Sequence, residues 1–291
     1  MWEVHKPSEQ EEKMFETIRT HFPSISRELY EVFDNGWDNQ VIMLDKKIIF
    51  RFPRNEYVKN IHQKEEKLLK LASKYVELNI PNYKLLTNDH SCVWYEAIAG
   101  IPMTVATYQW LSNDTKKYIQ TQVADFLTQL HSVPLDELEK IWYAHHKWGS
   151  EYFKKDFLST CRHIFTDEEI DIVLNYINEL DNLDSSQKVL THCDIQQKNI
   201  FIDDKLTHIT WVIDFSDAII ADPALDFGRL SEYWVEFMNS VYEQYRWIKD
   251  DLFLYRAMFY NKRLAIFMLT DAVQKGKDIE KNIEMFRSVF F

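Results

Sequence analysis

The chain has 291 residues, which is enough for one large or two moderate domains with a substantial core. Its hydrophobic content of 46% and aromatic content of 15% indicate a folded globular protein and exclude an intrinsically disordered one. The net charge of −12 argues against nucleic acid as the main partner and would suit a cationic small molecule, although such acidity often serves only to keep a protein in solution.

The sequence lacks the features of a membrane or secreted protein. No apolar run approaches the length of a membrane span, and residues 1–13 lack the charged-then-apolar pattern of a signal segment. The three cysteines, Cys92, Cys161 and Cys193, form no paired pattern, which is typical of a reducing compartment. We therefore expect a cytoplasmic monomer with no membrane partner.

The N-terminal residues predict a helix followed by a small sheet. Ser8 and Glu11 form a capping-box signal, and Met14, Ile18 and Phe22 lie four residues apart on one helical face. Strand-like runs follow at residues 28–33, 40–44 and 47–52. The turn at residues 34–39 contains Gly36 and would lie over the phosphates of a nucleotide, but a turn with one glycine more often only joins strands.

A basic residue interrupts the apolar third strand. Arg51 points to the face opposite that of its two phenylalanine neighbours, so its side chain reaches either the solvent or a cleft. The helix expected at about residues 56–78 carries Glu65 on its apolar stripe, and a carboxylate on an inward face requires a cation. Arg51 is the nearest candidate, with Glu66 as its alternative partner. A basic residue paired with a helix glutamate positions phosphates in kinases.

Two more strands are predicted at residues 83–87 and 92–98. The composition then changes from strand-like to helix-like, so we place a boundary between residues 1–96 and residues 97–291. A linker between two lobes commonly holds the base of a ligand through backbone groups.

The second part predicts helices. One amphipathic helix ends near His131, which we interpret as a structural hydrogen-bonding residue and not as a catalyst. Residues 135–183 indicate a helical insertion with many aromatic residues, which are more often part of a core than ligand contacts.

The residues from 189 to 215 carry the strongest functional pattern. They read VLTHCDIQQKNIFIDDKLTHITWVIDF, in which Asp194, Asn199 and Asp214 have the spacing of the kinase pattern H-R-D, four residues, N and then D-F-G. Asp194 follows a short apolar run, so it would leave the end of a strand on an accessible loop. This arrangement predicts a kinase-like phosphotransferase.

The chemistry follows from a predicted hairpin at residues 200–202 and 209–215, which returns Asp214 to the vicinity of Asn199. Mg²⁺ is usually held by one or two carboxylates together with substrate phosphates, and these two residues supply oxygen ligands. Asp194 is then left to accept the proton of an attacking hydroxyl.

Other interpretations of this stretch are weaker. Any one of the aspartates, taken alone, is equally consistent with an exposed acidic loop. A zinc site at His192 and Cys193 is disfavoured, because adjacent side chains diverge and no C-x-x-C or H-x-x-x-H pair supports it.

The residues after Asp214 bear on the acceptor. A protein kinase has a longer activation segment and an A-P-E motif here, whereas this chain has neither, so we expect a small-molecule acceptor. Glu232 and Glu236 lie four residues apart on one face of an expected helix, where they either line a pocket for amines or form a solvated face.

Three segments together, THCDIQQKN, IDFSDAIIADPALDF and IIFRFPR, resemble the aminoglycoside phosphotransferase family, and most closely its 2''-phosphotransferase branch. The likeness covers nearly the whole chain in motif order. It implies an α+β, two-lobed, protein-kinase-like fold, with an antiparallel five-stranded sheet in a nucleotide-binding N-lobe. A hinge near residues 95–100 would lead to a mainly helical C-lobe that binds substrate.

The resemblance also implies roles for individual residues. It implies that Asp194 is catalytic, that Asn199 and Asp214 bind magnesium, and that His192 and Asp226 give structural support. The nucleotide-binding residues would be Gly36, Arg51, Glu65, Tyr95, Glu96, Ala97 and Ile213. The substrate-binding residues would be Asp217, Glu232, Glu236 and Tyr260.

Some positions depart from the family pattern. Arg51 stands where the family often has lysine, which keeps the charge and changes the geometry. Ser216 replaces the glycine of D-F-G, and the segment between Asp226 and Glu236 is shorter than in the 2''-phosphotransferases.

The sequence thus predicts an enzyme that uses Mg²⁺ to transfer the γ-phosphoryl of ATP or GTP to a hydroxyl of a cationic small molecule, with an aminoglycoside first. A macrolide or an amino alcohol such as choline is the alternative acceptor. A catalytically silent kinase-like binding protein is the third hypothesis, suggested by Arg51 and by the glycine-poor turn.

Overall fold

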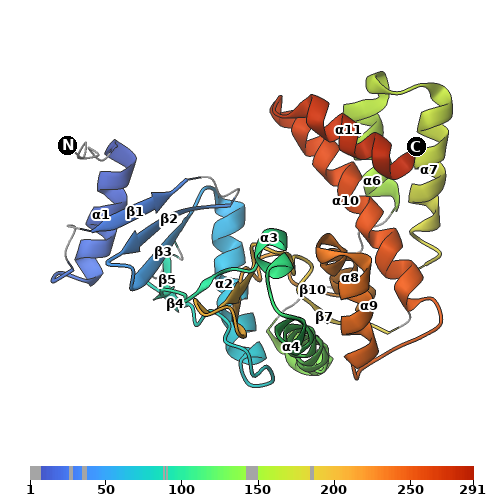
Figure 1. Cartoon of the computed structure of the whole chain (residues 1–291). Helices are drawn as coiled ribbons and strands as arrows, with labels where there is room; N and C mark the ends of the chain where they lie inside the picture. Colours follow the sequence, from blue (N-terminus) through green and yellow to red (C-terminus); the bar gives the residue numbers. More distant parts are fainter. Residues whose placement is uncertain are drawn as a thin grey trace.

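The computed structural model describes residues 8–25, 29–34, 38–87, 89, 91–141, 150–183 and 187–291. Figure 1 shows a small N-terminal part with a sheet and two helices, followed by a larger and mainly helical part. The expected α+β architecture is confirmed. Gly36 and residues 142–149 of the expected insertion lie outside the described residues.

The N-terminal part is an antiparallel sheet with a helix on each face. Its strands are β1 (Tyr30–Phe33), β2 (Asn39–Leu44), β3 (Ile48–Pro53), β4 (Lys84–Leu85) and β5 (Val93–Glu96), in the order β1-β2-β3-β5-β4. Its helices are α1 (Glu9–His21), which begins with the predicted capping box of Ser8 and Glu11, and α2 (Glu56–Ala72).

Alternation along β3 determines what each face of the sheet contacts. Met14 and Ile18 of α1 pack with Ile42 and Phe50 in one buried cluster. Arg51 points to the other face, toward α2, and is itself buried. The sheet therefore separates an apolar layer under α1 from a charged layer under α2.

The helix α2 is shorter than predicted. It ends at Ala72 and not at residue 78, because the backbone N–H groups of Tyr75 and Val76 both bond the Ala72 carbonyl in a closing turn. The chain then extends so that Asn79 forms a parallel bridge with Trp211. This bridge ties the N-terminal part to the hairpin that carries Asp214.

The C-terminal part contains most of the helices and two small sheets. The helices are α3 (Val105–Gln109), α4 (Asn113–His131), α5 (Leu135–Lys140), α6 (Ser150–Cys161), α7 (Asp167–Glu179), α8 (Ala224–Leu230), α9 (Val235–Gln244), α10 (Phe253–Lys275) and α11 (Ile279–Phe290), with short 3-10 turns at Arg162–Ile164 and Ser231–Tyr233. The sheets are β7 (Val189–Thr191) with β10 (Ile219–Ala221), and β6 (Ile101–Pro102) with β8 (Ile200–Ile202) and β9 (Ile209–Val212).

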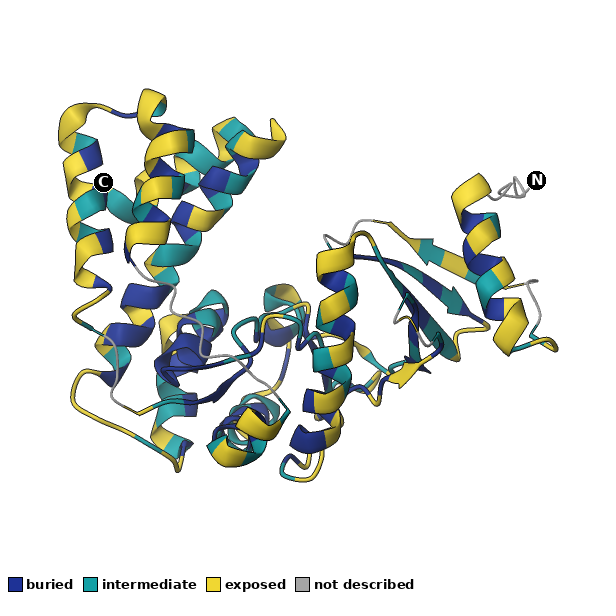
Figure 2. Cartoon of the chain, turned by 180° about the vertical axis from the view of Figure 1, so that it is seen from behind, coloured by how far each residue is buried: buried dark blue, intermediate teal, exposed yellow. Residues whose placement is uncertain are grey.

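The core of this part lies between the small sheets and the helices, and Figure 2 shows the dark buried faces turned inward. The short helix α8 packs tightly on the long helix α10. A Cβ added at Gly228 of α8 would lie 2.6 Å from the Ala257 carbonyl oxygen, so only glycine permits this approach. This close packing therefore positions the residues that follow Gly228 relative to α10.

Glycine has a second structural role where the chain leaves β5. Gly100 has φ +100°, and a Cβ there would lie 2.3 Å from the Ile202 carbonyl oxygen. This contact places the residues around Gly100 directly against β8 of the β8–β9 hairpin. Within the described ranges, no helix is both long and apolar enough to cross a membrane.

Candidate active site

The loop after β7 is held by the buried carboxylate of Asp226. Asp226 of α8 accepts the backbone N–H groups of His192 at 2.9 Å and Cys193 at 2.7 Å. It also contacts His131 Nε2 at 3.0 Å, while His131 Nδ1 lies 2.7 Å from the Tyr245 hydroxyl. His131 thus makes the hydrogen bonds of a structural residue, with an acidic partner that is remote in sequence.

His192 fixes the other side of the loop. Its Nε2 lies 3.0 Å from the Ile213 carbonyl, which can only accept, so this nitrogen donates. Its Nδ1 then accepts the backbone N–H of Asp194 at 3.2 Å. Both ring nitrogens are engaged, which contradicts the alternative of a zinc site at His192.

Asp194 stands at the end of this loop, and both of its carboxylate oxygens have partners. Oδ1 accepts from Gln196 Nε2 at 2.5 Å and from Arg229 Nη2 at 3.0 Å. Oδ2 accepts from Asn199 Nδ2 at 2.8 Å. The structure therefore brings Asp194 and Asn199 into direct contact.

The β8–β9 hairpin brings the second aspartate back, as its spacing predicts. Ile200 pairs with Val212, and the Ile213 N–H donates to the Asn199 carbonyl at 2.9 Å. The strand was predicted to continue to residue 215, but it ends at Val212 because Asp214 adopts φ +68°. This left-handed residue turns the chain out of the ladder and into the cleft.

Arg51 meets Asp214 from the sheet. Arg51 Nη1 lies 3.6 Å from Glu65 Oε1, and Nη2 lies 3.7 Å from Asp214 Oδ1. The cleft orientation of Arg51 and its pairing with Glu65 in place of Glu66 are thus found in the structure. Arg51 also donates to the Tyr83 hydroxyl, so its guanidinium is anchored on three sides.

The pKa values of Arg51 and Glu65 depend on their burial and on their mutual attraction. Burial acts to lower the pKa of Arg51, but Glu65 and Asp214 outweigh it, so the pKa is raised above its ordinary value. Burial raises the pKa of Glu65, and Arg51 opposes that change. The arginine therefore stays charged in the cleft.

The linker residues differ in what they can offer a nucleotide. Tyr95 is buried and stacks on Tyr83 with ring centres 5.0 Å apart. Glu96 is exposed at the end of β5, and the Ala97 N–H already donates to the Lys47 carbonyl at 2.7 Å. Ala97 can therefore offer a base its carbonyl but not its N–H.

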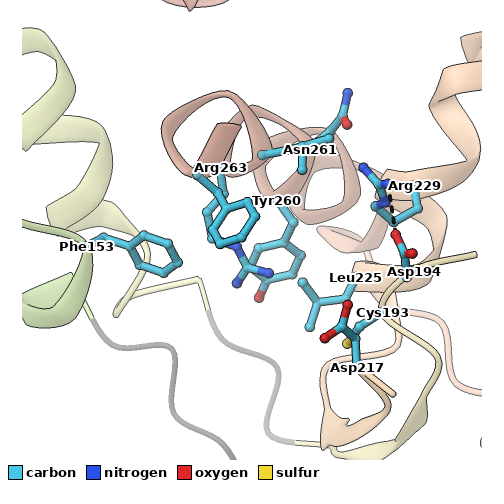
Figure 3. A pocket seen from close by; sticks show the side chains of 12 residues that line it. Phe153, Cys193, Asp194, Asp217, Leu225, Arg229, Tyr260, Asn261 and Arg263 are labelled. Carbon is cyan, nitrogen blue, oxygen red and sulfur yellow. Dashed lines mark hydrogen bonds and ion pairs between the residues drawn. The ribbon is translucent and has the colours of Figure 1, made fainter. Parts of the chain in front are cut away.

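A hollow of about 170 Å³ opens beside Asp194, between the loop, α8 and α10 (Figure 3). Asp217 and Tyr260, two of the predicted substrate residues, line it together with Asp194. The Tyr260 hydroxyl donates to Asp222 Oδ2 at 2.9 Å, which fixes the ring as part of the wall. The remaining lining is largely apolar and comprises Phe153, Cys193, Leu225, Gly228, Leu264 and Phe267, with the polar residues Arg229, Asn261 and Arg263.

Asp217 is surrounded by like charges. Its side chain faces solvent in the hollow, yet the surrounding protein and the neighbouring carboxylates of Asp194, Asp214 and Asp38 raise its pKa to about 6. A carboxylate in this position favours any cation that enters, because binding relieves the repulsion.

Glu232 and Glu236 do not lie on one helix, which corrects the sequence interpretation. Glu232 belongs to the 3-10 turn Ser231–Tyr233, and α9 begins only after Trp234, whose φ of +133° breaks the helical path. Glu232 Oε1 lies 3.0 Å from Arg229 Nη1, whereas Glu236 is exposed on α9. Neither lines the hollow directly.

Three charged residues of the cleft were not singled out from the sequence. Asp38 lies near Arg51 and Asp214, with a pKa raised first by burial and then by Asp214. Arg229 and Arg263 line the hollow, and Arg263 lies against the rings of Phe153 at 5.5 Å and Tyr260 at 5.8 Å. Of these three residues, only Asp38 could have been suggested by the sequence, because it lies in the turn after Gly36.

The sequence model of the phosphotransferase enzyme family matches residues 30–256. The chain belongs to this family. The match covers the five-stranded sheet, residues 95–100 and the three residues Asp194, Asn199 and Asp214.

Solved structures agree with this membership at the level of the fold. A complex of APH(2")-IIIa with GDP and kanamycin is similar with a TM-score of 0.86 and 20% identity, covering 95% of this chain and 98% of that one. ADP-bound APH(2'')-Ib has a TM-score of 0.77 and 20% identity over 96% of each chain. Macrolide 2'-phosphotransferase MphH from Brachybacterium faecium has a TM-score of 0.73 and 14% identity, covering 96% of this chain and 98% of that one.

The donor atoms of Asn199 and Asp214 fit a hard cation that is also bound by phosphates. The Asn199 amide nitrogen donates to Asp194, which turns its oxygen away from that residue. Asp214 has a side chain 35% exposed, and its Oδ1 accepts from Ser216 at 3.0 Å. Mg²⁺ is usually held by one or two carboxylates together with substrate phosphates, so these two oxygen ligands would suit an ion that arrives with a nucleotide. Among the described residues, no group of three or more His, Cys, Asp or Glu side chains could hold a metal.

Proposed function

We propose that this phosphotransferase moves the γ-phosphoryl of ATP or GTP to a hydroxyl of a cationic small molecule, with an aminoglycoside as the first candidate. The observation that carries the proposal is the position of Asp194. It contacts Asn199 on the nucleotide side and lines the hollow on the other side. A carboxylate between a phosphate site and a small-molecule cavity is suited to phosphoryl transfer.

The nucleotide would bind between the sheet and the β8–β9 hairpin. Arg51, held by Glu65, would pair with its phosphates, while Asn199 and Asp214 would hold Mg²⁺, which neutralises phosphate charge when bound. Gly36, Tyr95, Glu96, Ala97 and Ile213 complete the proposed nucleotide contacts. The GDP and ADP complexes of the solved relatives support a nucleotide in this cleft.

Asp194 would act on the acceptor. Its carboxylate orients the hydroxyl and takes its proton as the hydroxyl oxygen bonds to the γ-phosphorus. The bond between that phosphorus and the bridging oxygen breaks, and its electron pair leaves with the nucleoside diphosphate. His192 and Asp226 would support this geometry by holding the loop rigid, since most of the rate enhancement in such reactions comes from positioning and charge.

The acceptor would bind in the hollow and along its rim. Asp217 and Tyr260 line the hollow, Glu232 contacts Arg229 of its wall, and Glu236 is exposed on the following helix α9. Carboxylates at these positions would attract the ammonium groups of an aminoglycoside. Kanamycin and gentamicin complexes of solved relatives support this class.

A macrolide is the second candidate, and the wall of the hollow favours it. Phe153, Leu225, Leu264 and Phe267 present an apolar surface that a large lactone ring would cover better than a polyamine would. The fold similarity to a macrolide 2'-phosphotransferase is consistent with this alternative.

We further propose that residues 1–96 and 97–291 form the two lobes of a monomeric enzyme. Free cysteines at Cys92, Cys161 and Cys193 are compatible with the cytoplasm, where Mg²⁺ and nucleotides are abundant.

The test is transfer from γ-labelled ATP and GTP, with Mg²⁺, to a panel of aminoglycosides, macrolides and choline, followed by identification of the products. We expect a singly phosphorylated aminoglycoside and no transfer when Mg²⁺ is chelated. Product from macrolides alone would select the second candidate. Nucleotide binding without any phosphorylated acceptor would overturn the proposal.

A further inference from the structure

One guanidinium bridges the two acidic groups that a cationic acceptor would use. Arg229 Nη2 lies 3.0 Å from Asp194 Oδ1, and Nη1 lies 3.0 Å from Glu232 Oε1. The Arg229 side chain is only 13% exposed, and Figure 3 shows it directed at the Asp194 carboxylate. Asp194 and Glu232 therefore meet a protein cation before any acceptor arrives.

The packing of α8 on α10 supports Arg229. Its neighbour Gly228 packs closely against the Ala257 carbonyl of α10, and this contact positions the part of α8 that carries Arg229. Nη2 donates a charge-assisted hydrogen bond to Asp194, whereas the contact of Nη1 with Glu232 is an ion pair without hydrogen-bond geometry.

The bridge also changes the charge of the acceptor site. The guanidinium of Arg229 lies between the carboxylates of Asp194 and Glu232, so these three charges sum to a single negative one. Without Arg229 the same groups would carry two negative charges. Because partly buried charges are weakly screened, this difference acts strongly on a polycation.

We propose that Arg229 is a specificity-determining residue that occupies the place of an acceptor ammonium group between Asp194 and Glu232. An acceptor whose ammonium group lies beside the reacting hydroxyl must displace the guanidinium from Glu232. Acceptors with a neutral or apolar group at that point bind without this cost. This inference rests on the proposed function, because it takes the hollow as the acceptor site.

The test is the affinity for kanamycin in the presence of Mg²⁺ and a non-hydrolysable β,γ-imido nucleotide, measured by calorimetry. We expect Arg229→Gln to bind kanamycin about tenfold more tightly than the wild type, since two carboxylates lose their internal cation. Arg229→Lys keeps the charge but reaches only one carboxylate, and we expect a gain of about two- to threefold. Unchanged or weaker binding by both variants would overturn the proposal.

The Glu232→Gln variant provides the matched control. In that background Arg229→Gln should gain much less than it does when Glu232 is present, because the proposed ammonium position has lost one of its carboxylates. An equal gain in both backgrounds would show that Arg229 acts only through net charge and would contradict the bridging role. If Arg229→Gln does not fold, Arg229→Lys alone decides the result.

Failure of this inference and failure of the proposed function are distinguishable. The calorimetric measurement contains no phosphoryl transfer, so it reports on Arg229 whether or not the enzyme turns over. The proposed function fails when the wild type gives no phosphorylated acceptor. The inference fails when kanamycin affinity does not respond to the charge at Arg229.

Discussion

The two sides of Asp194 are built differently. On the nucleotide side, Arg51 lies between Glu65 and Asp214 at 3.6 and 3.7 Å, so a cation faces the place where phosphates would bind. On the acceptor side, Arg229 lies between Asp194 and Glu232 at 3.0 Å each, so a cation faces the place where a cation would bind. The first arrangement matches its proposed ligand in charge, and the second competes with it.

This difference between the two sides indicates which of them determines the choice of substrate. Arg51 is held by Glu65 and Tyr83 and already faces the proposed phosphate site, whereas the contacts of Arg229 with Asp194 and Glu232 must be broken before an acceptor ammonium group can replace them. We infer that nucleotide binding uses a site that is already complementary, while acceptor choice depends on what can replace Arg229.

The largest effect is expected where the two sides meet. Asp194→Asn should lower kcat by about a thousandfold, because an amide cannot take the proton of the hydroxyl. Steady-state phosphoryl transfer at saturating nucleotide measures this. Asp204→Asn, an exposed aspartate in the turn of the neighbouring hairpin, is the control and should leave kcat unchanged. Comparable rates for wild type and Asp194→Asn would remove Asp194 from the mechanism.

The nucleotide side was more accessible to sequence reasoning than the acceptor side, for a physical reason. Asp194, Asn199 and Asp214 lie on one loop and one hairpin, so short-range spacing determines their proximity. Arg51 and Glu65 could be paired because strand and helix periodicities assign each an inward face.

The acceptor side depends on packing between helices that are distant in sequence. Arg229 of α8 contacts Asp194 from a position 35 residues away in sequence, and no local pattern encodes that contact. The backbone break at Trp234 was equally hidden, since a non-glycine residue with positive φ has no sequence signal there. The Glu232 and Glu236 pairing was therefore wrong as a helix face, although both carboxylates remain proposed acceptor contacts.

The next effect concerns the support beneath Asp194. Asp226 is fully buried and serves two backbone N–H groups and His131, so Asp226→Ala leaves several buried polar groups without partners. We expect a loss of about 2–4 kcal/mol in the free energy of unfolding, measured by urea denaturation. Asp171→Ala, on the exposed face of α7, should change it by less than about 0.5 kcal/mol. A tolerated Asp226→Ala would show that the loop does not need this carboxylate.

A smaller effect is expected on the nucleotide alone. Arg51→Gln should raise the KM for ATP and GTP by about tenfold or more, because a charge-assisted contact to phosphate is lost. Arg51→Lys keeps the charge and should recover most of the affinity. Initial-rate kinetics with each nucleotide decide the matter, and an unaltered KM in Arg51→Gln would place the phosphates elsewhere.

The smallest effect concerns pH. Asp217 has a pKa raised to about 6, so it is charged at pH 7.5 and largely protonated at pH 5.5. Affinity for a cationic acceptor should therefore fall by about fourfold as the pH drops through this range, as the carboxylate fraction falls. Asp217→Asn should bind more weakly at pH 7.5 and lose this part of the pH dependence. A retained acid limb in Asp217→Asn would assign it to another group.

The separation of the two sides is tested most directly by measuring nucleotide and kanamycin dissociation constants side by side for Arg51→Gln and Arg229→Gln. We predict that Arg51→Gln weakens nucleotide binding by about tenfold and changes the dissociation constant of kanamycin by less than about twofold. We also predict that Arg229→Gln strengthens kanamycin binding by about tenfold and changes the dissociation constant of the nucleotide by less than about twofold. Arg229→Gln that weakens both ligands alike would contradict these predictions.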